Sequence, residues 1–106
     1  MKKFVFFFHG GRPTPENAEE HMKKWALWIS SISHGQEVPG APLHPTGKII
    51  SGPKGENVSD ATSANDTISG YLIVEANSFD EAAVLAKGSP GLENGGSVEV
   101  KEVMPM

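Results

Sequence analysis

The chain has 106 residues and a formal net charge of −4, and its length is that of one domain. It contains no cysteine, which excludes disulfides, thiolate metal sites and cysteine nucleophiles. Hydrophobic residues make up 38% and charged residues 21%, as in globular rather than disordered proteins. The sequence has no basic stripe, so nucleic-acid binding is not expected. We therefore expect a single domain over residues 1–106.

The first apolar segment is short. Residues 4–8 (Phe-Val-Phe-Phe-Phe) follow two lysines and are followed by His9 and two glycines. A secretory signal needs roughly 7–15 apolar residues, and a membrane span needs about 20. We therefore expect a buried strand over residues 3–9, no membrane segment and a cytoplasmic location.

A helix is predicted over residues 15–33, with Thr14 as its N-cap and Pro15 in the first helical position. Its apolar residues recur at spacings of three and four, which predicts one buried stripe. The helix is expected to end at Gly35. The stripe consists of Ala18, Met22, Trp25, Ile29 and Ile32.

Prolines and glycines dominate residues 36–57, and this composition predicts extended and turn structure. Within that segment, residues 48–51 suit a short strand and residues 52–55 (Gly-Pro-Lys-Gly) suit a type I turn. Residues 56–59 are expected to return as the hairpin partner. The small polar residues 59–69 are expected to form a mobile loop.

The last third predicts a strand, a helix and a second strand. Residues 70–77 form the first strand, and Ser78 with Glu81 three residues later is a capping box that begins the helix. The helix is expected to end near Lys87. Residues 97–103 alternate between apolar and charged, as in a strand with one buried face.

The predicted order is β-α-β-β-β-α-β, and right-handed crossovers place both helices on one face of the sheet. The first strand nevertheless presents Phe4, Phe6 and Phe8 to one face and Val5 and Phe7 to the other. At about 25 cal/mol per Å² of apolar area, an uncovered face of this size costs several kcal/mol. We expect a second copy to cover it, sheet against sheet about a two-fold axis. The alternative is that polar loops cover it.

The C-terminal residues also carry a family resemblance. Its segments are residues 70–76 (Gly-Tyr-Leu-Ile-Val-Glu-Ala), 78–82 (Ser-Phe-Asp-Glu-Ala), 86–90 (Ala-Lys-Gly-Ser-Pro) and 95–100 (Gly-Gly-Ser-Val-Glu-Val). This succession resembles the YCII-related family, a large branch of which carries an Asp-Gly-Pro-Phe motif. Residues 60–63 read Asp-Ala-Thr-Ser, so only Asp60 matches that motif. Weaker similarities are Met22, Trp25 and Trp28 on the first helix and residues 40–43.

The resemblance implies an α+β fold, a ferredoxin-like sheet with two helices on one face, assembled as a dimeric α/β barrel. It does not imply one function. Some relatives are small-molecule enzymes, including a dehydrochlorinase-like branch, and others accompany sigma factors. A His–Asp pair has been proposed as the active site in part of the family. Here the helix histidine is His21, about one turn early, and the aspartate is Asp60.

Three residues are predicted to be catalytic. His9 ends the first strand beside two glycines, where a ligand can approach the backbone closely, although a strand-end histidine can also be merely solvated. His21 lies one residue from the buried stripe, so it points either into a cleft or toward surface partners such as Glu20 or Lys24. Asp60 can orient an imidazole or act as a base, or it can be a turn aspartate.

Three more residues are candidate ligand contacts. Arg12 can hold an anionic ligand, His44 can line a pocket mouth in the proline-rich segment, and Tyr71 can present a hydroxyl to a pocket. The alternatives are a solvated loop arginine, a solvated histidine and a core tyrosine with one hydrogen bond. The remaining histidine, His34, is better explained by the helix dipole.

No metal or other cofactor is expected. The histidines are widely spaced without a His-Glu-x-x-His pattern, and both G-x-G-x-x-G and the Walker pattern are absent. Two function classes remain. One is a cofactor-free small-molecule enzyme that uses His and Asp for acid–base chemistry in a pocket, and the other is a non-catalytic ligand-binding or protein-interaction module. The residues alone leave open whether the chain is an enzyme.

Overall fold

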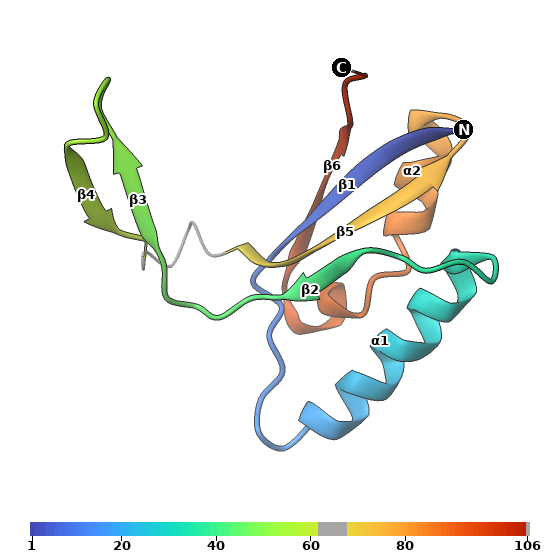
Figure 1. Cartoon of the computed structure of the whole chain (residues 1–106). Helices are drawn as coiled ribbons and strands as arrows, with labels where there is room; N and C mark the ends of the chain where they lie inside the picture. Colours follow the sequence, from blue (N-terminus) through green and yellow to red (C-terminus); the bar gives the residue numbers. More distant parts are fainter. Residues whose placement is uncertain (62–67, 106) are drawn as a thin grey trace.

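The apolar segment at residues 4–8 forms the centre of the sheet. In the computed structural model, which describes residues 1–61 and 68–105, the first strand pairs antiparallel with β5 on one side and β6 on the other (Figure 1). The sheet order is β2-β5-β1-β6. Its strands are β1 (Lys2–His9), β2 (Gly40–Pro42), β5 (Ile68–Ala76) and β6 (Ser97–Glu102).

Both helices pack on one face of this sheet. They are α1 (Ala18–Ser33) and α2 (Phe79–Ala86). Phe4 and Phe6 are fully buried between sheet and helices. The Phe6 ring stacks on Trp28 of α1 with centroids 6.3 Å apart, and Phe4 meets Phe79 of α2 edge-on at 5.8 Å. This is the predicted α+β, ferredoxin-like architecture, with both helices on one face of the sheet.

Helix α1 begins three residues later than predicted. Asn17, not Thr14, is the N-cap, because residues 14–17 close a turn in which the Asn17 side chain accepts from Thr14 N at 2.8 Å. The buried face is also rotated from the predicted stripe. His21, Trp28 and Ile32 are buried, whereas Met22 is 66% exposed. The rotation follows from Trp28, whose large ring lies over Phe6.

The strand β2 was not predicted, because residues 40–42 have no strand pattern of their own. They are extended because β5 offers an edge, where Ile73 N donates to Pro39 O at 2.8 Å. Gly40 permits this approach, since a Cβ there would come within 2.2 Å of Tyr71 O. Pro42 is tolerated because β2 is an edge strand. β2 completes the ferredoxin-like sheet.

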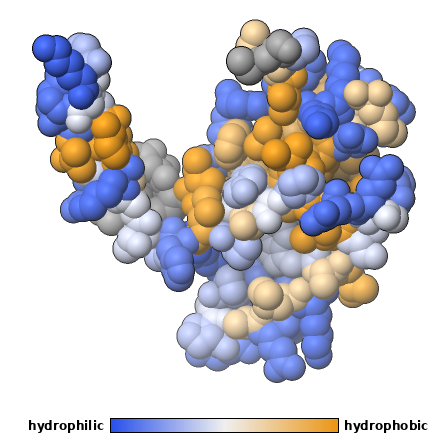
Figure 2. Space-filling view, in the orientation of Figure 1, coloured by the Kyte–Doolittle hydropathy of each residue, from blue (hydrophilic) through white to orange (hydrophobic). Residues whose placement is uncertain are grey.

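The predicted hairpin is confirmed. Strands β3 (Lys48–Ser51) and β4 (Asn57–Asp60) form a separate two-stranded sheet, and Gly55 N donates to Gly52 O at 3.0 Å across the turn. All residues of both strands are exposed. The hairpin stands apart from the rest of the chain as an arm, visible in Figures 1 and 2. Of the predicted mobile loop, residues 62–67 lie outside the described residues.

The predicted start of α2 is confirmed as well. Ser78 Oγ accepts from Glu81 N at 3.1 Å, and Ala82 and Ala86 are buried. The loop that follows contains a short 3₁₀ helix, η1 (Pro90–Asn94). It leads into β6, whose Val98 and Val100 contribute to the core.

The face of the sheet away from the helices remains partly open. Val5, Phe7, Tyr71 and Ile73 lie on it by register and are only partly buried. It is the apolar face that the sequence predicts to need cover. No helix in the described part of the chain has the length and hydropathy to cross a bilayer.

Candidate functional site

A cavity of about 520 Å³ opens between α1 and the end of the sheet where β1 stops. Its wall combines α1, the loop after β1, the β2–β5 edge and the start of η1. The wall is mostly apolar, and among the described residues that form it none is acidic. The residues of the wall include the aromatic Phe8, Trp25 and Tyr71 and the polar His9, Arg12, His21 and Ser89.

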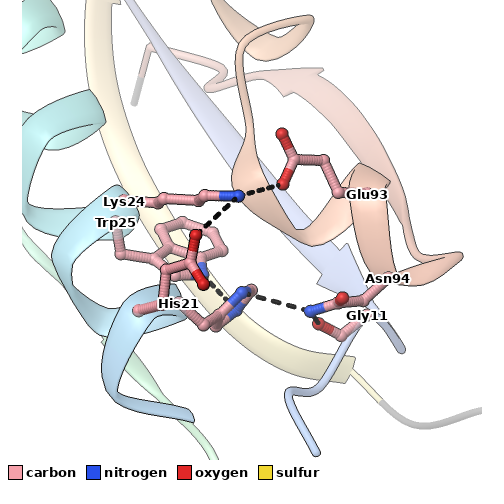
Figure 3. A network of polar contacts seen from close by, with 7 residues as sticks. Gly11, His21, Lys24, Trp25, Glu93 and Asn94 are labelled. Atoms are coloured by element: carbon pink, nitrogen blue, oxygen red, sulfur yellow. Dashed lines mark hydrogen bonds and ion pairs between the residues drawn. The ribbon is translucent and has the colours of Figure 1, made fainter. Parts of the chain in front are cut away.

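His21 is the buried titratable group of this wall, only 8% exposed. One helical turn later, the Trp25 indole donates its N–H to His21 Nε2 at 2.6 Å. The other ring nitrogen, Nδ1, lies 3.1 Å from the Asn94 side-chain amide of η1. Figure 3 shows the ring between these two neighbours. The predicted cleft position is therefore observed, and the alternative of a surface histidine is not.

The ring is held in its neutral form. An indole N–H can only donate, so Nε2 must keep a lone pair while this bond exists, and an imidazolium is incompatible with it. Burial lowers the pKa of His21 from its ordinary value of 6.5; the positive charge of Lys24 lowers it further, and Glu93 opposes both effects. Geometry and electrostatics thus agree on a neutral imidazole.

An ion pair ties helix α1 to η1 beside the histidine (Figure 3). Lys24 Nζ lies 2.8 Å from Glu93 Oε2 and 3.8 Å from Glu20 Oε1. The hydrogen bond with Lys24 lowers the pKa of Glu93, and the same bond raises the pKa of Lys24. Both side chains are solvent-exposed, so the pair orients the two elements more than it stabilises the fold.

Glycines allow the loop after β1 to reach the η1 loop. Gly11 has a φ of +68°, and a Cβ there would come within 2.6 Å of Gly91 O. A Cβ on Gly96 would come within 2.8 Å of Gly11 Cα. Larger side chains would push these loops apart, and Asn94 would then be lost from His21. The closing glycines are thus part of the site's construction.

The predicted catalytic residues are only partly brought together. His9 is in the cavity wall, but its Nε2 lies 3.0 Å from Glu99 Oε1. Glu99 pairs with Phe7 in the sheet, so the His9 ring is on the face away from α1. The hydrogen bond from His9 lowers the pKa of Glu99. The histidine that pairs with a carboxylate is therefore His9, and the buried histidine, His21 of α1, is a different residue.

Asp60 lies elsewhere. It ends β4 on the arm, where it forms an ion pair with Lys48 across the hairpin, and it is not in the cavity wall. His44 is exposed and also outside the wall, although it follows Leu43, whose carbonyl accepts a hydrogen bond from Arg12 of the wall. The structure does not join either residue to His21.

The other two predicted contacts are in the wall. Arg12 is exposed, and its Nη1 donates to Leu43 O at 2.7 Å, which leaves further guanidinium N–H groups for a ligand. Tyr71 is partly buried, and it pairs with Phe7 in the sheet. Its side chain therefore lies on the face away from the helices.

Sequence reasoning missed Asn94, Ser89 and Glu99. Asn94 and Ser89 are 73 and 68 positions from His21 along the chain, and both sit in a segment predicted as loop. Glu99 was predicted to face solvent on β6. Its position in an antiparallel partner of β1 places it diagonally opposite His9, but only a known register reveals that. No group of three or more His, Asp or Glu in the described part of the chain is placed to hold a metal ion.

Comparison with known proteins agrees with this fold. A solved structure, the 5-chloro-2-hydroxyhydroquinone dehydrochlorinase TftG from Burkholderia phenoliruptrix in complex with 2,5-dihydroxybenzoquinone, superposes with a TM-score of 0.52 and 17% identity. The match covers 96% of this chain and 93% of that one. No protein of the curated set matches the sequence. The model of the YCII-related domain matches residues 15–106. The chain belongs to the YCII-related domain family.

Proposed function

We propose that this chain binds a small aromatic molecule in the cavity beside α1 and acts on it by cofactor-free acid–base chemistry. The observation that carries the proposal is the neutral, buried His21 in the wall of a mostly apolar cavity. A neutral imidazole with a low pKa is a base at neutral pH. In a site with little water it exchanges protons with a substrate rather than with solvent.

The proposed step uses Nε2 of His21, which in this structure accepts a hydrogen bond from the Trp25 indole. A substrate hydroxyl that replaces the indole N–H at Nε2 donates its proton to the ring. The same nitrogen then gives this proton to another atom of the ligand or, when an anion such as chloride leaves, to solvent, and the ring is neutral again. Nδ1 on the opposite side carries the ring hydrogen in this step. The Asn94 amide beside it must present its oxygen to accept from Nδ1, as positioning groups do for catalytic histidines. Trp25 is itself in the wall, so ligand and indole compete for one nitrogen.

An aromatic ligand suits the cavity's shape and chemistry. Phe8 and Trp25 contribute flat apolar surface, with ring centroids 4.8 Å apart and planes at 88°. A volume of about 520 Å³ lies within the ordinary range for small-molecule sites. The TftG structure contains 2,5-dihydroxybenzoquinone, and at 17% identity it supports only the choice of this compound as a first probe.

A non-catalytic binding module is the second candidate. It is favoured by the occupancy of both His21 ring nitrogens by Trp25 and Asn94, since a purely structural histidine would look the same. Under this alternative the cavity binds a ligand without changing it.

The two candidates predict different results for one pair of variants. Wild type, His21→Gln and the exposed control His34→Gln are compared for binding of 2,5-dihydroxybenzoquinone and for chloride release from 5-chloro-2-hydroxyhydroquinone. The enzyme hypothesis predicts turnover by wild type and His34→Gln, with a loss of about 10²-fold or more in His21→Gln. Binding without turnover in all three proteins would support the module, and no binding in any would contradict both. His9→Gln and Asp60→Asn test the other predicted catalytic residues in the same assay.

We also propose that two copies associate through the open face of the sheet. Partly buried Val5, Phe7 and Ile73 form its apolar centre. Charges of both signs border it on β1, β5 and β6, so a two-fold-related copy can bring opposite charges together. These charges belong to Lys3, Glu75, Glu99 and Lys101.

A further inference from the structure

One polar atom of the cavity region has no partner. Ser89 is in the cavity wall and only 3% exposed, and its hydroxyl makes no hydrogen bond with any residue that the structure describes. It precedes η1, yet its side chain makes no capping hydrogen bond there. A buried hydroxyl without a partner destabilises a protein and is uncommon. The position of this unpaired hydroxyl in a cavity wall indicates that a bound ligand supplies its hydrogen-bond partner.

Gly91 shows where this partner would lie. A Cβ built on Gly91 would lie 3.8 Å from Gly11 O, 3.8 Å from Trp25 Cζ2 and 3.9 Å from Ser89 Oγ. Those are ordinary contact distances, so the space over Gly91 is bounded by a backbone carbonyl, the indole ring and the serine hydroxyl. A ligand oxygen that lies roughly 1 Å closer to Ser89 than this Cβ position is within hydrogen-bond distance of the hydroxyl.

The charge of the wall restricts the ligand further. The chain has 13 acidic residues and 9 lysines and arginines, yet the described wall contains Arg12 and no carboxylate. His21 is neutral, as its bond with Trp25 requires. Among the described wall residues the fixed charge is therefore positive, in a chain that is acidic as a whole, and this arrangement favours anions over cations.

We propose that the cavity selects an aromatic anion, a carboxylate or an acidic phenol, and that Ser89 donates its hydroxyl proton in a hydrogen bond to the ligand's oxygen over Gly91. The proposal rests on the function proposed above and adds the ligand's charge and a specificity-determining contact. Arg12 of the cavity wall complements the negative charge of the ligand.

The experiment measures binding and melting temperature together. Benzoate and benzamide, equal in shape but different in charge, are titrated into wild type, Ser89→Ala and a control outside the cavity wall, Ser59→Ala on the exposed strand β4. We expect wild type to bind benzoate at least tenfold more tightly than benzamide. Ser89→Ala should lose about tenfold in affinity for benzoate, the value of one charge-assisted hydrogen bond, and Ser59→Ala should not. Ser89→Ala should also melt at least about 4 °C higher without ligand, because its unpaired hydroxyl is gone.

A second variant fills the same space. Gly91→Ala meets only ordinary contacts, so it should keep the melting temperature and lose benzoate binding. If wild type binds benzoate and Ser89→Ala binds it equally, the serine contact is wrong while the proposed function stands. A lower melting temperature in Ser89→Ala would show that the hydroxyl has a structural partner, and would overturn the contact as well. Equal binding of benzoate and benzamide overturns the charge selection, and binding of neither contradicts the proposed function too.

Discussion

The indole nitrogen of Trp25 lies 2.6 Å from Nε2 of His21, one turn away on α1. This bond joins the cavity's largest aromatic wall to its only buried titratable group among the described residues. It sets the protonation state of the ring, because the indole can donate but cannot accept.

Replacing Trp25 by Phe removes this donor and keeps an aromatic ring. Nε2 can then accept a proton, so the pKa of His21 should rise toward 6.5 while burial still holds it somewhat lower. An NMR titration of the His21 ring protons measures the change. Trp28→Phe is the matched control, since Trp28 donates to Leu85 O instead. An unchanged His21 pKa in Trp25→Phe would show that the bond does not govern protonation.

The stability of the fold should depend on pH through His21. Its folded pKa is below 6.5, and its unfolded pKa is near 6.5. Between these values the unfolded chain binds more protons, so the free energy of unfolding rises with pH. The stabilisation is fully present above pH 6.5 and is lost as the pH falls through the folded pKa.

Urea unfolding at several pH values from 7.5 downward tests this. The pH dependence should become flatter in His21→Gln than in wild type, whereas the exposed His34→Gln should keep the wild-type slope. Equal slopes in all three proteins would assign the dependence to other groups.

The open face should hold two copies together. We expect wild type to sediment as a dimer at micromolar concentration and Phe7→Asp to sediment as a folded monomer, because a buried charge at the interface centre is strongly unfavourable. Val84→Asp, at a 62% exposed position of α2, should remain a dimer. A wild type that sediments as a monomer contradicts the proposed interface.

The loop after β1 and the η1 loop approach so closely at Gly11 that no side chain should be tolerated at this position. Gly35 offers a comparison, since its φ of +79° resembles the +68° of Gly11 but nothing lies within 4 Å of its added Cβ. Gly35→Ala should therefore lower the free energy of unfolding by about 1 kcal/mol. Gly11→Ala should lower it by at least about 3 kcal/mol, because it adds a clash with Gly91 O. Chemical denaturation measures both, and equal losses would mean that the loops yield without cost.

Elements defined by neighbouring residues could be predicted from the sequence. The hairpin follows from its Gly-Pro-Lys-Gly turn, and α2 follows from Ser78 and Glu81. The start of α1 was wrong because Asn17 competes with Thr14 for the same turn, and the side-chain bond to Thr14 N decides between them. β2 could not be predicted because its strand conformation comes from the edge of β5.

The site was less predictable than the fold. His21 could be identified as a candidate from its position near the helix stripe, but its neutral state depends on Trp25, which the sequence suggested only as core. Asn94 and Ser89 reach the cavity only after Gly11, Gly91 and Gly96 have brought two loops together. Contacts between residues that lie so far apart along the chain leave no local pattern in the sequence.

Because of the arm formed by β3 and β4, the amide hydrogens of this chain fall into two classes of protection against exchange with solvent. A two-stranded hairpin is only marginally stable alone in water, and all residues of both strands are exposed. Its amide hydrogens should exchange with deuterium by local opening, while those of the central strand, between Phe4 and Phe8, exchange only when the whole domain unfolds. A protease would accordingly cut the arm first and leave two fragments that stay associated, because β1 in the first fragment pairs with β5 and β6 in the second.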